Sequence, residues 1–307
     1  MKRREALKDI ALGGLVLGLG RGAAARPRHG VAAQTPSPAK TAPDLSVISA
    51  ESPAAAARAA VAALGGMAAF VGRGDKVIIK PNIGWDRTPE MAACTNPEVV
   101  AALVGLVLEA GAKEAVVMDN TTNQAKRCYV RSGIAEAAKQ AGAKVLFTDD
   151  YRLKKTALQG AWLKEWDVFA DFLEADKVIN VPIAKVHSLT RLSMGMKNWL
   201  GAIGGARHQL HQKLDEAMVD LAAFFKPALT VLDAYRILVK NGPQGGRLSD
   251  TRLVKTIIAG RDQVAVDAFG ATLFDVQPGE LAYLRIAQER GLGRHELGGL
   301  TIEKRTV

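Results

Sequence analysis

Apolar residues in this chain form short continuous runs, separated by longer stretches with helical spacing. Lys76–Lys80 (KVIIK) and Lys177–Pro182 have the length and composition of buried strands, and polar residues follow each of them. Between them, Asn96 and Pro97 form an N-cap and first-turn pair, and Gly111 closes the helical stretch that they begin. The pattern therefore predicts strands and helices in alternation.

The same reasoning covers the rest of the chain. It predicts strands at Leu45–Ser49, Lys76–Lys80, Glu114–Asp119, Lys144–Thr148, Lys177–Pro182, Leu229–Asp233 and Leu253–Ile258. It predicts helices at Pro53–Val71, Glu98–Ala110, Ser132–Ala141, Met194–Ile203, Leu214–Phe225, Asp262–Phe274 and Gly279–Arg290. Such alternation is typical of an α/β fold with a mostly parallel, doubly wound sheet and helices on both faces. We expect one α/β domain over residues 44–307, with a possible sub-domain at 185–250.

The first 33 residues predict a signal for export. Arg3 and Arg4 open the chain in the manner of a twin-arginine signal, and Ile10–Gly20 is an apolar stretch too short to span a bilayer. Residues 34–43 contain three prolines and indicate a linker. The alternative is a basic N-terminus without this role. We expect the protein to use the twin-arginine export machinery and to work in the periplasm, with no membrane span in its mature form.

Charge and cysteine content narrow the function classes. The net charge is +10, but residues 1–33 hold seven of the 41 basic residues and two of the 31 acidic ones, which leaves +5 elsewhere. These charges are scattered, which argues against nucleic-acid binding and favours small anionic ligands. Cys94 and Cys128 are too few for a four-thiolate iron–sulfur cluster or a structural zinc site. They form either one disulfide or two separately buried thiols.

Polar side chains follow several predicted strands at their carboxyl ends, where open α/β sheets bind ligands. Each residue taken alone could be a surface side chain or a turn cap. Their recurrence predicts a shared site. The residues are Lys80, Asn82, Asp119, Lys185, His187 and Asp233.

The stretch from residue 185 to residue 201 is the richest in candidate chemistry. In extended backbone, Lys185 and His187 point to the same side. Lys197 and Asn198 lie inside an apolar segment, so Lys197 either extends to solvent or contacts an anion. A buried lysine with a lowered pKa could also act as a base or as a Schiff-base nucleophile.

Histidines and a glycine-rich loop offer further ligand candidates. His208 and His211 share a face if their segment is helical, and with His187 they could bind a metal, with Asp233 as a candidate carboxylate. The loop that begins at Gly242 could present backbone N–H groups to a phosphate or a carboxylate. It has no P-loop lysine, so it does not by itself indicate nucleotide binding.

Taken in order, these residues resemble the family catalogued as domain of unknown function 362, over roughly residues 45–290. The shared positions are Lys80-Pro81-Asn82, Thr95-Asn96-Pro97, Lys185, His187, Thr190, Lys197-Asn198, Gly201, His211, Asp233, Gly242-Pro243 and Asp267-Ala268. The resemblance implies no assigned reaction. Many members carry a ferredoxin-like module with four cysteines, and because this chain has two, we expect no iron–sulfur cluster. The Lys/His/Lys arrangement also distantly resembles the nickel-pincer lactate racemases, at the level of fold analogy.

Three functions are compatible with these residues. The first is an enzyme acting on a small anionic substrate that bears phosphate or carboxylate, with Lys185, Lys197, His187 and Asp233 as catalytic residues. His187 would be its general acid or base, and Asp233 would orient His187. The second is a non-catalytic binding protein for a small anion or a metal, and the third is a structural or partner-binding protein. In the first two, a further set of residues would bind the ligand: Lys80, Asn82, Asp119, Asn198, His211 and Gly242.

Overall fold

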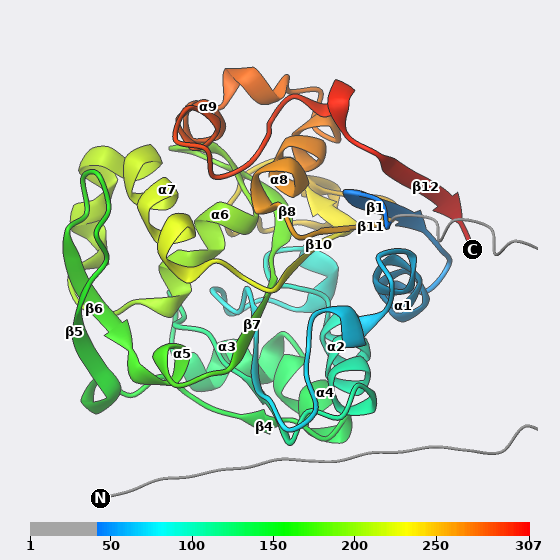
Figure 1. The fold of residues 1–307 in the computed structure, drawn as a ribbon, viewed down its shortest axis with the longest axis horizontal. Coiled ribbons are helices and arrows are strands. Elements are labelled where there is room, and N and C mark those ends of the chain that lie inside the picture. The colour runs from blue at the N-terminus through cyan, green and yellow to red at the C-terminus, as the bar shows by residue number, and fades with distance from the viewer. Residues whose placement is uncertain (1–41) are drawn as a thin grey trace, which may run out of the picture. The chain divides into compact units, whose positions relative to one another are not determined.

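A ten-stranded sheet forms the centre of the computed structural model, which describes residues 42–307 (Figure 1). Its strands are β1 (Leu45–Ser49), β2 (Lys76–Pro81), β3 (Glu114–Val117), β4 (Lys144–Val145), β7 (Lys177–Val181), β8 (Ile183–His187), β9 (Arg191–Ser193), β10 (Leu229–Leu238), β11 (Thr251–Gly260) and β12 (Ile302–Thr306). The main path runs β12-β1-β11-β10-β7-β2-β3-β4, and β8 pairs with β10 and β9.

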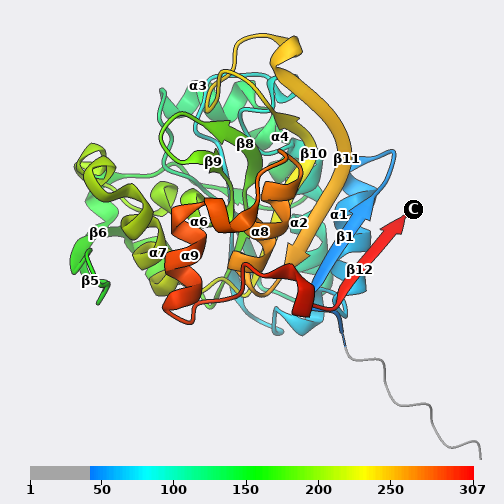
Figure 2. The ribbon, with the colours of Figure 1, turned by 90° about the horizontal axis from the view of Figure 1, so that it is seen from above.

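Strand direction in this sheet agrees with the predicted class. On the main path only β11 runs against its neighbours, pairing antiparallel with β1 and β10, while the other neighbouring pairs are parallel. Figure 2 shows β12, β1, β11 and β10 side by side at one edge of the molecule. The prediction of a mostly parallel sheet is therefore confirmed.

Two helical layers cover this sheet. Its helices are α1 (Pro53–Ala63), α2 (Pro97–Glu109), α3 (Ala125–Arg131), α4 (Ile134–Gln140), α5 (Ala170–Leu173), α6 (Gly195–Asn198), α7 (Leu214–Phe225), α8 (Gln263–Thr272) and α9 (Ala282–Glu289). Successive strand residues face opposite layers: Ile78 packs in the core with α7, α8 and α9, and Ile79 packs in the core with α1, α2 and α4. Continuous apolar strands are the consequence of burial on both faces, as predicted.

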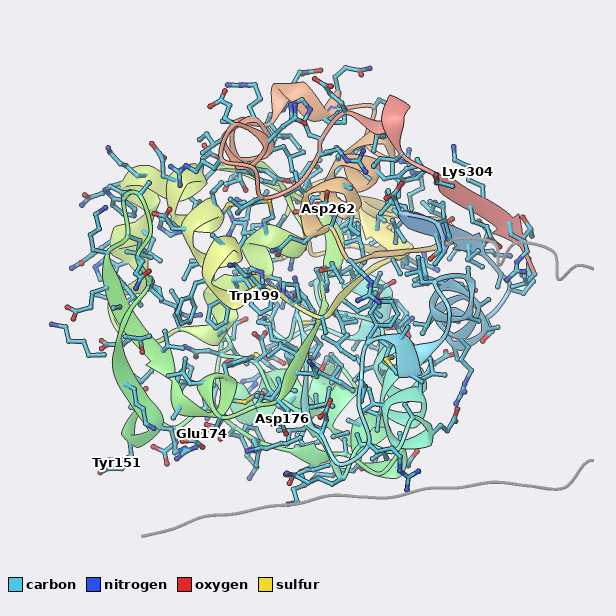
Figure 3. All side chains as sticks on the ribbon, in the orientation of Figure 1. Tyr151, Glu174, Asp176, Trp199, Asp262 and Lys304 are labelled. Atoms are coloured by element: carbon cyan, nitrogen blue, oxygen red, sulfur yellow. The ribbon has the colours of Figure 1, made fainter. Side chains whose placement is uncertain are left out.

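The segment after α6 is anchored in the first of these cores. Trp199 opens a 3-10 turn, η4 (Trp199–Ala202), and its ring stacks on Phe225 with centroids 4.7 Å apart. Its indole N–H donates to the side-chain oxygen of Gln263 at 2.8 Å. Figure 3 shows Trp199 in the interior, in contrast to Tyr151 at the periphery, which is 96% exposed.

Several predicted boundaries were wrong because local backbone chemistry interrupts the pattern. The predicted helix Pro53–Val71 ends at Ala63, where Gly65 and Gly66 adopt positive φ. The predicted helix Ser132–Ala141 is preceded by α3, and Gly133, also at positive φ, separates α3 from α4. A two-stranded antiparallel sheet, β5 (Leu153–Ala157) with β6 (Glu165–Phe169), was not predicted, because β5 is largely polar and β6 is only five residues long.

The predicted export signal at 1–33 and nearly all of the linker at 34–43 lie outside the described residues. The residues that are described fall in one compact unit, and residues 185–250 contribute β10 and α7 to it. Within residues 42–307, no helix has both the length and the apolar character that a bilayer crossing requires.

Candidate functional site

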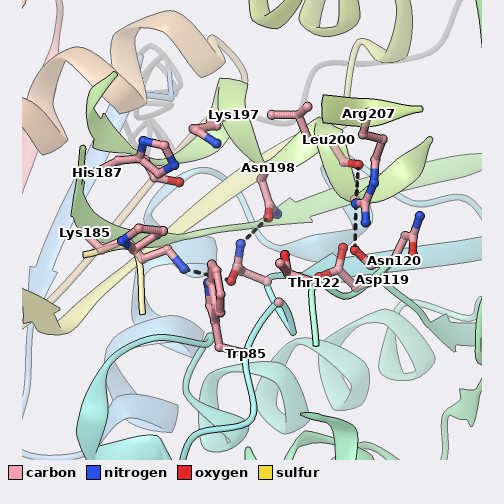
Figure 4. A pocket seen from close by; sticks show the side chains of 15 residues that line it. Trp85, Asp119, Asn120, Thr122, Lys185, His187, Lys197, Asn198, Leu200 and Arg207 are labelled. Carbon is pink, nitrogen blue, oxygen red and sulfur yellow. Dashed lines mark hydrogen bonds between the residues drawn. The ribbon is translucent and has the colours of Figure 1, made fainter. Parts of the chain in front are cut away.

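A cavity of about 90 Å³ opens beside the carboxyl ends of β2 and β3 (Figure 4). The loops after these strands supply Asn82 and Asp119 to its lining, and β8 supplies Lys185 and His187. Three more polar side chains line it from α6 and from η5 (Arg207–Lys213): Lys197, Asn198 and Arg207. The parallel strands thus bring together residues more than a hundred positions apart in sequence.

A buried ion pair lies directly beneath the cavity. Nζ of Lys80 is 2.5 Å from Oδ1 of Asp119, and the two side chains are 0% and 2% exposed. The other carboxylate oxygen accepts from the backbone N–H of Ile83 at 2.6 Å. Burial lowers the pKa of Lys80 and raises the pKa of Asp119, while their mutual attraction opposes both shifts. Lys80 is therefore held by a counter-ion and is not free to bind a ligand.

A chain of side-chain hydrogen bonds orients the floor of the cavity. Lys185 donates to Oδ1 of Asn82 at 3.1 Å and to the carbonyl of Ala93 at 2.6 Å. Asn82 donates to Oδ1 of Asn198 at 3.2 Å, and Asn198 donates to Oδ1 of Asn180 at 2.9 Å. Buried polar groups are costly when unpaired, so these hydrogen bonds fix the orientation of the Asn82 and Asn198 side-chain amides.

Three cationic side chains line the cavity without a carboxylate partner. Among residues 42–307, no Asp or Glu forms an ion pair with Lys185, Lys197 or Arg207, and the lining carboxylate Asp119 is already paired. Burial, together with nearby cations, lowers the pKa of Lys185 and of Lys197 to about 8. The cavity therefore carries excess positive charge in a poorly solvated setting, which favours an anionic ligand.

Arg207 is the main lining cation that sequence reasoning missed. Its guanidinium donates to the carbonyls of Asn120, Leu200 and Thr121 at 3.0–3.1 Å. Only tertiary structure brings this arginine to the site, because the sequence pattern of its segment drew attention to the neighbouring His208 and His211 instead. Trp85, which lines another wall of the cavity, was also missed.

His187 is held as a neutral imidazole. Its Nδ1 accepts from the backbone N–H groups of Leu189 at 3.1 Å and Thr190 at 3.5 Å, which leaves the proton on Nε2. Burial lowers the pKa of His187 to about 3, and the charges of Lys197 and Lys185 add to this effect. At neutral pH, Nε2–H is therefore a hydrogen-bond donor.

Asp233 does not join these residues. It lies within β10 rather than at its end, since the strand continues to Leu238. Its oxygens accept from the backbone N–H groups of Asn96 at 2.7 Å and Tyr235 at 2.9 Å. The carboxylate is thus committed to the backbone, and the expected Asp233–His187 contact is absent from the hydrogen bonds among residues 42–307.

Of the ligand candidates, His208, His211 and Gly242 also fall outside the cavity lining. His208 and His211 are exposed on η5, and across residues 42–307 no three His, Cys, Asp or Glu side chains are grouped to hold a metal ion. The backbone of Gly242 lies so close to Val186 that a Cβ would be 1.9 Å from its carbonyl oxygen. Gly242 is therefore a close-packing position, and its neighbour Pro243 lines the cavity.

Cys94 and Cys128 are separate, buried free thiols. The sequence left open one disulfide or two separately buried thiols, and the structure shows the two thiols. Sγ of Cys94 donates to the carbonyl of Trp85 at 3.2 Å, and burial raises the pKa of this thiol to about 12. Both cysteines therefore act as packed core residues.

Comparison with known proteins gives the class of this chain. Residues 77–272 match the family model described as Domain of unknown function (DUF362), so the chain belongs to that family. It is 28% identical over 237 residues to the thylakoid-associated protein sll1697 of Synechocystis sp. (strain ATCC 27184 / PCC 6803 / Kazusa), covering 75% of this chain and 72% of that protein.

A solved structure is also similar. The lactate racemase apoprotein from Thermoanaerobacterium thermosaccharolyticum aligns with a TM-score of 0.49 and 11% identity. The alignment covers 74% of this chain and 56% of the racemase, so this chain spans little more than half of that protein's length.

Proposed function

We propose that this protein is an enzyme acting on a small anionic substrate, bound through a phosphate or carboxylate group. One observation carries the proposal: Lys185, Lys197 and Arg207 converge on one cavity, and no carboxylate among residues 42–307 pairs with them. Lys185 is buried and Lys197 and Arg207 are half-buried, and such a cluster of cations is costly unless an anion completes it. The export predicted from residues 1–33 stays a prediction.

The size of the cavity limits the bound group. The cavity of about 90 Å³ is partly open to solvent, so its inner part suits one compact oxyanion better than a whole nucleotide. Larger parts of a substrate would extend toward solvent past Trp85 and Thr122, which lie on the lining of the cavity.

An enzyme is favoured over a capture protein by the titration of the lining residues. Charge alone would suffice to capture an anion. This cavity adds a neutral imidazole, His187, and amines with pKa values of about 8, which exchange protons near physiological pH. His187 would serve as a neutral donor to a substrate oxygen, in place of the acid–base role expected from sequence.

Phosphate binding tests the proposal. Inorganic phosphate should raise the melting temperature of the wild-type protein, because a ligand that binds only the folded state stabilises it. Lys197→Met should weaken phosphate binding by tenfold or more, about 1.4 kcal/mol, as measured by calorimetry. Lys139→Met, at an exposed position on α4 away from the cavity, should leave affinity unchanged.

Equal affinity in wild type and Lys197→Met would place the anion elsewhere and contradict the proposal. If phosphate and a panel of small carboxylates bind tightly but none is converted, the protein is a binding protein that uses the same cavity.

A further inference from the structure

We propose that Lys197 is a nucleophilic amine, which forms an imine with the carbonyl carbon of a small substrate that also carries an anionic group. This inference rests on the proposed anion site and deepens it by naming the substrate class. Lys197 differs from the other lining lysine in its contacts, in its place within the cavity, and in what surrounds it.

The contacts of the cavity lysines separate their roles. Lys80 is locked to Asp119, and Lys185 is committed to Asn82 and Ala93. By contrast, no hydrogen bond or ion pair joins Nζ of Lys197 to any residue among 42–307. Figure 4 shows its side chain between His187 and Asn198, reaching the cavity with no dashed contact. Its amine is thus the one free to meet a ligand atom.

The surroundings of Lys197 favour a neutral, reactive amine. Lys197 is half-buried, and its sequence neighbours Met196 and Trp199 are fully buried. Burial and the charges of Lys185 and Arg207 lower its pKa to about 8. At pH 7 about one such amine in ten is unprotonated, against fewer than about one in a thousand for an ordinary lysine. A neighbouring cation is a known means of activating a lysine toward carbonyl compounds.

The remaining lining groups suit the rest of such a substrate. Lys185 and Arg207 attract its anionic group, and Nε2–H of His187 can donate to its carbonyl oxygen. His187 is near enough to Lys197 for the lysine charge to lower the imidazole pKa. A polarised carbonyl, a nearby neutral amine and an anion anchor are the components that imine formation requires.

The step balances without an oxidant or a reductant. The amine lone pair attacks the carbonyl carbon, a C–N bond forms, and the carbonyl π pair moves to oxygen. Proton transfer from nitrogen to that oxygen yields the carbinolamine. Loss of water, made of this oxygen and two protons from the amine, leaves the C=N bond. The adjacent carbon is then acidified, as in other lysine-dependent reactions.

Trapping with borohydride tests the inference. Full-length protein is incubated with glyoxylate or with glycolaldehyde phosphate, which carry a carboxylate and a phosphate respectively, and is then reduced. We expect one adduct per chain, whose mass is that of the probe less one oxygen atom, located at Lys197 by peptide mapping. Labelling should be at least tenfold faster than at any other lysine and should increase as pH rises through 8. Acetaldehyde, which has no anionic group, should react much more slowly.

Matched variants distinguish the amine from its charge. Lys197→Arg keeps the positive charge but removes the nucleophile, so labelling should vanish while phosphate still raises the melting temperature. Lys139→Arg should label as wild type does. The inference would be overturned if neither carbonyl probe labelled Lys197. It would also be overturned if Lys197 were labelled no faster than the surface lysines.

The same data separate this inference from the proposed function. If phosphate stabilises the wild-type protein but no adduct forms at Lys197, the anion site stands and the imine is wrong. If phosphate does not raise the melting temperature of wild type or of Lys197→Arg, the anion site fails. If acetaldehyde then labels Lys197 as fast as the anionic probes do, the substrate class proposed for Lys197 is wrong as well.

Discussion

Gly201 occupies a position where the backbone passes directly over the Lys80–Asp119 ion pair. A Cβ at this position would lie 1.8 Å from Oδ1 of Asp119 and 2.7 Å from Nζ of Lys80. The carbonyl of Gly201 also accepts from the backbone N–H of Asn120 at 2.8 Å, which fixes the approach from the other side. Only a glycine can let η4 approach this closely.

We expect Gly201→Ala to destabilise the protein by about 3 kcal/mol, because the backbone has to move or the buried ion pair has to open. Urea denaturation measures the change. Gly246→Ala is the matched control, since a Cβ there would meet no atom within 4 Å and its φ is not positive. Similar midpoints for the two variants would show that the close approach is not needed.

Helix α6 shows how a four-residue element is held in place from another part of the chain. Asp267, on α8, accepts from the backbone N–H groups of Gly195 at 2.6 Å and Met196 at 2.9 Å. These are orphan donors at the start of α6, and no side chain of its own cap satisfies them. Asp267 therefore positions the helix that carries Lys197 and Asn198, although it does not line the cavity.

Replacing Asp267 with Ala should cost about 2–3 kcal/mol of stability, since two buried N–H groups lose their acceptor. It should also weaken phosphate binding, because α6 is no longer held in place. Asp220→Ala is a matched control: Asp220 accepts from three backbone N–H groups at residues 161–163, which are not in the cavity lining. A general loss of stability would affect both variants, whereas only Asp267→Ala should change phosphate affinity in the protein that remains folded.

At the scale of the whole molecule, the stability of the free protein should depend on the cost of its unpaired cations. The pKa of Lys197 falls from 10.5 in the unfolded chain to about 8 in the folded one. Between these values the unfolded chain binds more protons, so raising the pH adds stability. Below pH 8 both states are charged, and the cost of burying the charge is paid in full.

We therefore expect Lys197→Met to be more stable than wild type at pH 7.5, by about 1–2 kcal/mol, with a gap that narrows as the pH approaches 10. Urea denaturation of both proteins across this pH range measures the gap. Subtracting the wild-type free energy of unfolding from that of the variant at each pH cancels the titration of other groups. A gap independent of pH would show that the Lys197 amine is well solvated.

Much of the sheet could be predicted from the chain itself. The central strands are short apolar runs because both faces of the sheet are covered. Such runs can be recognised from the sequence without knowing which strands pair with them. The ends of β2 and β3 supplied Asn82 and Asp119 for the same reason, since carboxyl ends of parallel strands share one edge. The strands missed were those with polar or short sequences, such as β5 and β9, whose pairing depends on tertiary contacts.

Residue types and their order along the chain determined the family, the layered α/β class and the recruitment of Lys185, His187 and Lys197 to one site. Tertiary structure alone decided how each of them is partnered. It paired Lys80 with Asp119, committed Asp233 to backbone amides and brought Arg207 to the cavity. The physical reason is that charge, pKa and hydrogen bonding depend on burial and on neighbours distant in sequence. Identical lysines therefore differ in chemistry once the chain is folded.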